Sequence, residues 1–101
     1  MFLLTDRKAS PQELSDELLI TRVARGDTSA LETLYDRHAA LLLGMCLKLS
    51  QDRTTAEQVL QEIFWQVWQR AATYQTQQGS FTGWLFRIAR ELAGPVRKKT
   101  E

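Results

Sequence analysis

Apolar residues recur every three or four positions along most of the chain and almost nowhere alternate with polar ones. This spacing places apolar side chains on one face of a helix, whereas alternation would indicate strands. Only two prolines and five glycines interrupt the 101 residues, which leaves long segments free to be helical. The sequence therefore predicts an all-α fold, a compact bundle of three to four helices.

The first predicted helix follows Ser15, a preferred N-cap residue. Asp16 and Glu17 fall in its first turn, where acidic side chains favour the positive end of the helix dipole. Gly26 is expected to end it. Residues 1–12 show no periodicity, and we expect a flexible N-terminal arm there. The predicted apolar stripe of this helix is Leu14, Leu18, Leu19 and Val23.

The second predicted helix begins near Asp27 or Thr28 and runs to about Ser50. Its middle is apolar nearly all round, which indicates a central helix contacted on two sides. The third begins at a capping box formed by Thr54 and Glu57. The main stripe of the second helix is Leu31, Leu34, Tyr35, Leu42, Met45, Cys46 and Leu49. That of the third is Ala56, Val59, Leu60, Ile63, Phe64, Val67, Trp68 and Ala71.

A fourth helix follows a polar loop over residues 75–79, with Ser80 as its expected N-cap. Proline lacks an amide hydrogen and crowds the preceding turn, so Gly94-Pro95 is expected to end or kink this helix. The globular domain is therefore predicted over residues 13–96, with a basic tail over 97–101. The stripe of the fourth helix is Phe81, Trp84, Leu85, Ile88, Ala89 and Leu92.

Charge is balanced overall but unevenly distributed. The chain has 13 Lys and Arg against 12 Asp and Glu, a formal charge of +1. Residues 13–62 carry nine acidic and five basic side chains, whereas residues 63–101 carry six basic and two acidic ones. The second half is therefore the candidate to bind an anionic partner.

Catalytic, metal-binding and membrane-spanning functions find no support in the residue pattern. One cysteine and one histidine cannot supply the four ligands of a structural zinc site. A single cysteine also cannot form an internal disulfide. His38 falls on the core stripe of the second helix, and Cys46 lies in its most apolar stretch, so both are interpreted as structural. The longest apolar run, residues 39–47, is about half of what a bilayer requires. We expect a cytoplasmic protein without enzymatic activity, metal or cofactor.

Trp65 lies on the polar side of the third predicted helix, away from the stripe that contains Trp68. It could cover a loop or the N-terminal arm. Alternatively, it is the anchor of a protein-binding face, since rigid aromatic residues among polar neighbours are typical of such anchors. The residues of this face are Gln58, Gln61, Glu62, Trp65 and Gln69.

Cations adjoin aromatic residues around the fourth predicted helix, a combination that suits a single nucleic-acid strand. Phe81 and Trp84 have the spacing of core residues, so they are less available for stacking. The freer candidates are Tyr74, Phe86, Arg87, Arg90, Arg97 and Lys98, together with the loop amides.

Two separated segments resemble region 2 of bacterial extracytoplasmic function (ECF) sigma factors: residues 56–68 (AEQVLQEIFWQVW) and 79–90 (GSFTGWLFRIAR). Upstream, residues 24–27 (ARGD) and 30–35 (ALETLY) fit the first conserved block of that family. The resemblance extends over about residues 15–93, and two motifs in the correct order make it specific.

The resemblance implies that the third helix docks on the clamp helices of the RNA polymerase β′ subunit, with Gln61, Glu62, Trp65 and their neighbours as contacts. It also implies that the loop 74–80 and the fourth helix open the promoter −10 element and hold its non-template strand. An anti-sigma factor is an expected partner, and the chain alone is expected to be a monomer. The helix-turn-helix domain that reads the −35 element in this family has no counterpart, so an excised domain or a natural fragment is expected.

Within the loop, we expect Gln77, Gln78, Gly79 and Ser80 to enclose one flipped base, with Tyr74 stacking on it. Without the resemblance, glutamines that keep a surface turn soluble would be the preferred explanation of the loop.

Three positions depart from the family pattern. Gln58 stands where an Asp is usual and Glu91 where an Asn is usual, and Gly94-Pro95 interrupts the basic helix. Gln58 implies that one acidic contact to polymerase is missing. Glu91 and the Gly94-Pro95 break favour one alternative, a protein-binding helical adaptor that has lost DNA binding. A second alternative, a helix-turn-helix repressor, is opposed by the length of the loop before the fourth helix.

Overall fold

The part of the chain that the structure describes forms four α-helices and one short 3-10 helix. The computed structural model describes residues 14–75, 77 and 79–100, with side chains as far as Ala93. The predicted all-α class is confirmed, and the described residues contain no strand. The predicted arm over residues 1–12 lies outside them. The elements are α1 (Asp16–Ala24), α2 (Thr28–Ser50), α3 (Arg53–Arg70), the 3-10 helix η2 (Ala71–Thr73) and α4 (Phe81–Thr100).

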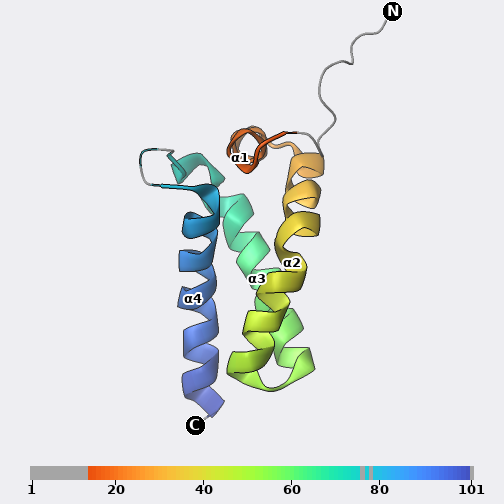
Figure 1. Cartoon of the computed structure of the whole chain (residues 1–101), viewed down its shortest axis with the longest axis vertical. Helices are drawn as coiled ribbons and strands as arrows, with labels where there is room; N and C mark the ends of the chain where they lie inside the picture. The colour runs from red at the N-terminus through yellow and green to blue at the C-terminus, as the bar shows by residue number, and fades with distance from the viewer. Residues whose placement is uncertain (1–13, 76, 78, 101) are drawn as a thin grey trace, which may run out of the picture.

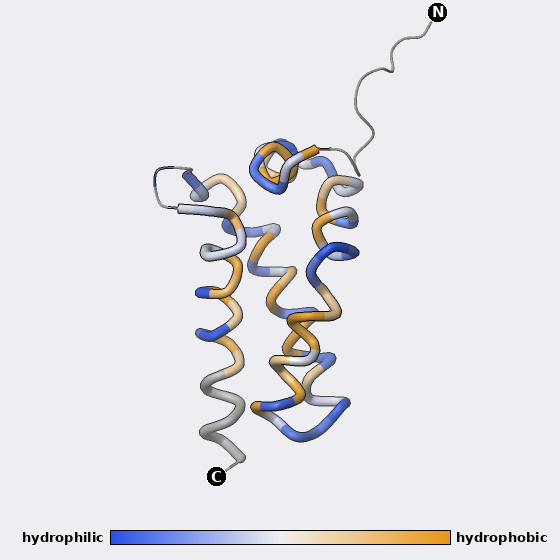
Figure 2. Tube along the Cα trace, in the orientation of Figure 1, coloured by the Kyte–Doolittle hydropathy of each residue, from blue (hydrophilic) through white to orange (hydrophobic). Residues whose placement is uncertain are grey.

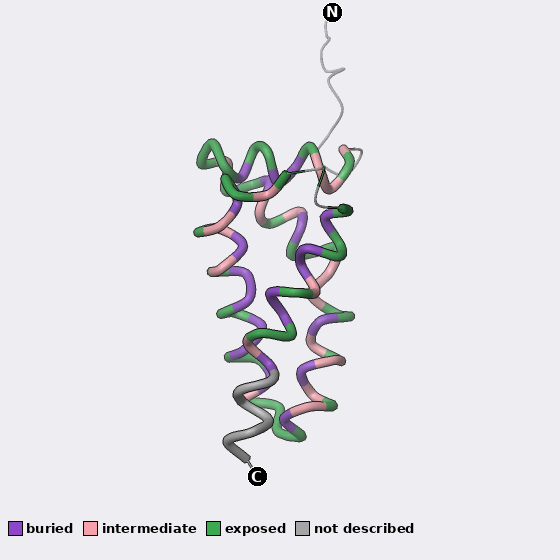
Figure 3. Tube along the Cα trace, turned by 90° about the vertical axis from the view of Figure 1, so that its left-hand side faces the viewer, coloured by how far each residue is buried: buried purple, intermediate pink, exposed green. Residues whose placement is uncertain are grey.

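Three long helices, α2, α3 and α4, lie lengthwise beside one another, and α1 crosses one end of this group (Figures 1 and 3). Helix α2 contacts α1, α3 and α4, which confirms its predicted central position. The turn between α2 and α3 lies at the opposite end from α1 (Figure 1). The loop that precedes α4 therefore lies at the same end as α1.

Side-chain caps fix where α1 and α2 begin. The Leu18 amide donates to Ser15 Oγ at 3.1 Å, which confirms the predicted cap of α1. Asp27 accepts from the amides of Ser29 and Ala30, which confirms the predicted start of α2. The side-chain hydrogen bond from Ser29, followed by that from the Ala30 amide, lowers the pKa of Asp27.

Helix α3 begins differently from the prediction. Its N-cap is Asp52, whose carboxylate accepts from the Thr55 amide at 2.8 Å, so the predicted capping box of Thr54 and Glu57 is wrong. Gln51 adopts a left-handed conformation with φ 60°, and this tight turn brings Asp52 into the cap position. Glu57 instead pairs with Arg53 at 2.8 Å along the exposed surface. The side-chain and amide hydrogen bonds from Thr55 lower the pKa of Asp52.

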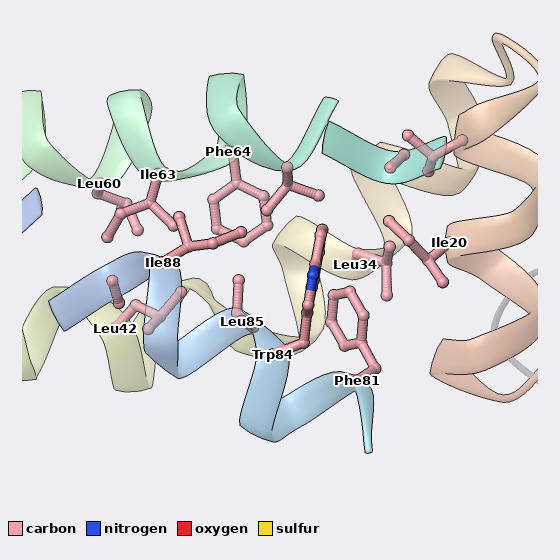
Figure 4. Packing of buried hydrophobic residues seen from close by; sticks show 14 of the residues in the cluster. Ile20, Leu34, Leu42, Leu60, Ile63, Phe64, Phe81, Trp84, Leu85 and Ile88 are labelled. Carbon is pink, nitrogen blue, oxygen red and sulfur yellow. The ribbon is translucent and has the colours of Figure 1, made fainter. Parts of the chain in front are cut away.

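One apolar core joins the four helices. Hydrophilic positions of α4 lie on its outer side and hydrophobic ones turn toward α2 and α3 (Figure 2). Figure 4 shows core side chains from all four helices meeting between them. Fully buried members include Leu34, Leu42, Ile63, Phe81, Leu85 and Ile88.

Eight predicted core residues are less buried than expected. Leu18 is 55% exposed and Ile20, absent from the predicted stripe, is buried. The reason is that α1 crosses the other helices, so only a narrow stripe of its surface reaches them. Tyr35 is 39% exposed because its ring meets the core only edge-on. The other six are partly buried: Leu14, Leu31, Met45, Leu49, Trp68 and Leu92.

The fourth helix also differs from the prediction, since α4 continues through Gly94-Pro95 to Thr100. The predicted end of the helix at this dipeptide is wrong. Proline has a φ value compatible with a helix, so the chain continues through Pro95 despite the lost hydrogen bond and the crowding of the preceding turn. Arg97 and Lys98 therefore belong to α4, although their side chains lie outside the described residues.

Candidate nucleic-acid and protein-docking surfaces

The outer face of α3 carries the exposed tryptophan that the sequence predicted. Trp65 is 52% exposed, and it borders an apolar groove of about 280 Å³ between α2 and α3. The lining comes from helices α2 and α3, so no described loop covers the ring. The other residues predicted for this face, Gln58, Gln61, Glu62 and Gln69, are all exposed. The groove is lined by Thr28, Leu31, Gln61, Phe64, Trp65 and Trp68.

The loop before α4 is fixed by its first aromatic residue. The hydroxyl of Tyr74 donates to the Gly79 carbonyl at 2.8 Å. Its half-buried ring packs edge-on against Trp84 at 5.5 Å and Phe81 at 6.2 Å between ring centroids. Burial, and then the charge of Glu17, raise the pKa of Tyr74 above its ordinary value. This ring therefore has a structural role at the root of the loop.

Backbone geometry closes the loop at its far end. Gly79 has φ +112°, a conformation that favours glycine, so the predicted turn is confirmed. Ser80 Oγ accepts from the Gly83 amide at 3.1 Å, which confirms Ser80 as the cap of α4. Gln77, Gly79 and Ser80 are exposed, and Gln78 lies outside the described residues.

The predicted nucleic-acid contacts of α4 divide between its two sides. Phe86 is half-buried and lines an apolar groove of about 400 Å³ against α2, together with Leu41, Met45 and Lys48. Arg87 lines a polar groove of about 410 Å³ on the α3 side. Arg90 is exposed, and the described residues give neither Arg87 nor Arg90 an ion-pair partner. The structure therefore does not bring Phe86 and Arg87 together.

An ion pair between α3 and α4 occupies the polar groove. Arg70 lies 3.2 Å from Glu91 and also donates to Gln66. Glu91 thus has a structural partner at the position where the family usually has Asn. Periodicity gives no sign of this contact because it depends on how two helices cross.

The contact that sequence reasoning missed most clearly is made by Glu17. Its carboxylate accepts from the backbone amide of Phe81 at 2.9 Å, across 64 residues. The sequence suggested only a dipole interaction within the first helix. Local spacing carries no signal for a partner so distant in the chain.

His38 and Cys46, which the sequence indicated to be structural, both lie within the packed part of the fold. His38 Nε2 lies 3.0 Å from Asp16 Oδ2, and the ring is partly buried beside Phe81. Cys46 is buried, and burial raises the pKa of its thiol. Among the described residues, no cluster of three metal-ligating side chains occurs. None of the described helices has the length and apolar character needed to cross a membrane.

Comparison with known proteins assigns the class of this helical domain. The family described as Sigma-70 region 2 matches residues 34–94, which include α3, the loop and most of the described part of α4. The chain therefore belongs to the sigma-70 region 2 family and is a domain of the ECF type.

Two relatives illustrate the likeness. The "ECF RNA polymerase sigma factor SigK" of Mycobacterium sp. (strain KMS) is 34% identical over 77 residues, covering 76% of this chain and 40% of the relative. The protein of the same name from Mycobacterium tuberculosis (strain ATCC 25177 / H37Ra) is 32% identical over 85 residues, covering 82% of this chain and 46% of the relative. The chain thus spans less than half the length of these relatives. No solved structure matches the chain.

Proposed function

We propose that the chain is the promoter-recognition and promoter-melting module of an ECF sigma factor. The observation that carries the proposal is the sigma-70 region 2 match, because residues 34–94 contain the exposed face of α3, the loop and the first part of α4. The exposed α3 face docks on the clamp helices of the RNA polymerase β′ subunit. Its contacts are Gln58, Gln61, Glu62, Trp65 and Gln69.

The loop and α4 hold the non-template strand of the −10 element. Trapping an unstacked base stabilises the open promoter by differential binding, so strand separation needs no hydrolysis and the module is not an enzyme. Within the fold, Tyr74 supports the loop from inside, which leaves the exposed amides and backbone groups to meet the base. Tyr74, predicted from the sequence to stack on the base, is therefore assigned to holding the loop. The proposed DNA contacts are Gln77, Gln78, Gly79, Ser80, Phe86, Arg87, Arg90, Arg97 and Lys98.

Further elements of the proposal follow from the family. The module acts in the cytoplasm, is a monomer on its own and is controlled by an anti-sigma factor. The polymerase supplies all of the chemistry of transcription.

A single-stranded DNA titration tests the nucleic-acid part. We expect the 101-residue chain to bind a −10-like oligonucleotide more weakly as salt rises, since each phosphate contact to a single strand contributes a slope of about −0.7. Arg87→Ala should weaken all sequences alike and reduce this slope. Exchanging residues 75–79 for an equally long Gly-Ser segment should instead change the base preferred at one position. Unchanged affinity and base preference after the exchange would refute base capture by the loop.

The second candidate function is a helical adaptor that binds only protein. The carboxylate of Glu91 beside Arg87 in the polar groove favours it, since a negative charge there opposes a phosphate. An adaptor would bind the β′ clamp helices through Trp65 and show no salt-dependent DNA binding. The same titration therefore separates the two functions.

A further inference from the structure

Two hydrogen bonds close the base of the loop, and their partners come from different parts of the chain. At one side, the Tyr74 hydroxyl donates to the Gly79 carbonyl at 2.8 Å. At the other, the Phe81 amide donates to a carboxylate oxygen of Glu17 at 2.9 Å. The two bonds grip backbone groups that flank Ser80. The loop is therefore held on both sides of Ser80, the N-cap of α4.

The Glu17 contact crosses between helices that are far apart in sequence. Glu17 lies in the first turn of α1, which crosses the end of the bundle where the loop lies (Figure 1). Its partner Phe81 is the first residue of α4, and the Phe81 side chain is fully buried. The core fixes this ring, so the hydrogen bond joins α1 to an anchored point of the loop.

The carboxylate also occupies a position that would otherwise suit an anion. The first amides of a helix have no partner within the helix and attract negative charge. At α4, Ser80 takes the Gly83 amide and Glu17 takes the Phe81 amide. A nucleic-acid phosphate therefore finds the Phe81 amide already satisfied by the protein's own carboxylate.

We propose that Glu17 is a positioning residue that fixes the base of the loop where it enters α4, at Gly79, Ser80 and Phe81, in the geometry that selects a base. This inference rests on the proposed function of the loop and adds a residue outside the family match, which begins at residue 34. Glu17 does not touch the strand. It acts through the Phe81 amide, so its effect falls on which base is preferred more than on overall affinity.

Three single variants of the 101-residue chain test this role. Glu17→Ala removes the acceptor, whereas Glu17→Gln keeps an oxygen acceptor and removes the charge. Asp52→Ala is the matched control, because it deletes another capping carboxylate, that of α3, at the opposite end of the molecule. Each variant is measured against single-stranded oligonucleotides in which every position of a −10-like sequence is varied in turn. Amide hydrogen exchange of Phe81 is followed by NMR in parallel.

We expect Glu17→Ala to speed exchange at the Phe81 amide about tenfold, the effect of one charge-assisted hydrogen bond. It should also abolish discrimination between bases at the oligonucleotide position that the loop contacts. The affinity for the preferred oligonucleotide should fall by a smaller factor than this discrimination. Glu17→Gln should retain most of both properties. Asp52→Ala should lower thermal stability without changing discrimination.

Three results would overturn the proposal. One is faster exchange in Glu17→Ala with base discrimination intact. Another is equal loss of discrimination in Glu17→Ala and Asp52→Ala, which would show only general destabilisation. The third is unchanged exchange at Phe81 in Glu17→Ala. If the wild-type chain binds no DNA, the proposed function fails, and a base-selecting role for Glu17 fails with it, whereas the exchange measurement still reports whether Glu17 holds the loop.

Discussion

Replacing Phe81 by alanine should be among the most damaging single changes in the domain. The Phe81 side chain is 0% exposed, and its ring lies among Tyr74, Trp84 and His38. Removing a buried aromatic side chain costs about 3–5 kcal/mol, because transfer energy and packing are both lost. Domains of this size are stable by about 5–15 kcal/mol, so this loss removes from about a fifth of the free energy of unfolding to all of it. The melting temperature should fall by roughly 15–30 °C.

Urea unfolding followed by far-UV circular dichroism measures this loss directly. Leu41→Ala is the control, since Leu41 is 65% exposed and a surface substitution changes stability by only about 0.5 kcal/mol. A constant m-value in both variants would show that the folded and unfolded states have kept their compactness. If Phe81→Ala cost less than about 1.5 kcal/mol, the start of α4 would not be anchored in the core. The argument that the loop has a rigid base would then fail.

Three further outcomes are expected. Trp65→Ala should weaken binding to a β′ clamp-helix fragment by at least tenfold, about 1.4 kcal/mol, in an anisotropy titration. The variant should lose less stability than one in which a core side chain is deleted. Unchanged binding would show that Trp65 is not part of the docking face. The lowered pKa values of Asp27 and Asp52 contribute stability above pH 3.8 that is lost as the pH falls below it. The variant with Asn at both positions keeps the caps and should show a shallower acid dependence in urea unfolding between about pH 2 and 6, whereas an identical profile would contradict this. Buried Cys46 should react with a thiol reagent at a rate set by opening of the fold, so urea should accelerate it, and fast labelling in native buffer would show an accessible thiol.

Local features of the chain were predictable from sequence. The limits of α2, the Ser15 cap and the buried stripe of α3 follow from helical periodicity and capping chemistry, which need only neighbouring residues. The exposure of Trp65 followed from the same periodicity, since its position falls outside that stripe.

Features that depend on how helices cross were not predictable. The exchange of Leu18 for Ile20 in the core reflects the angle at which α1 meets the bundle, and the Glu17 contact reflects the same crossing. The separation of Phe86 from Arg87 requires knowing which neighbour each side of α4 faces. Each is a tertiary property that spacing along one helix does not encode.

The ion pair between Arg70 and Glu91 bears on the choice between a DNA-binding module and an adaptor. As an isolated departure from the family pattern, Glu91 suggests a DNA face that has decayed. In the structure, its charge is opposed by Arg70 at 3.2 Å, and Arg87 lines the same groove. Both members of the pair are partly exposed, so it adds little stability. Its main effect is to neutralise the carboxylate, which leaves the groove with a net positive charge from Arg87.

On the other side of α4, Lys48 lies beside the half-buried ring of Phe86. Trp84 also lines the polar groove but is only 7% exposed, so of these two rings only Phe86 offers a partly exposed aromatic surface beside a cation, the combination that binding of a single strand uses.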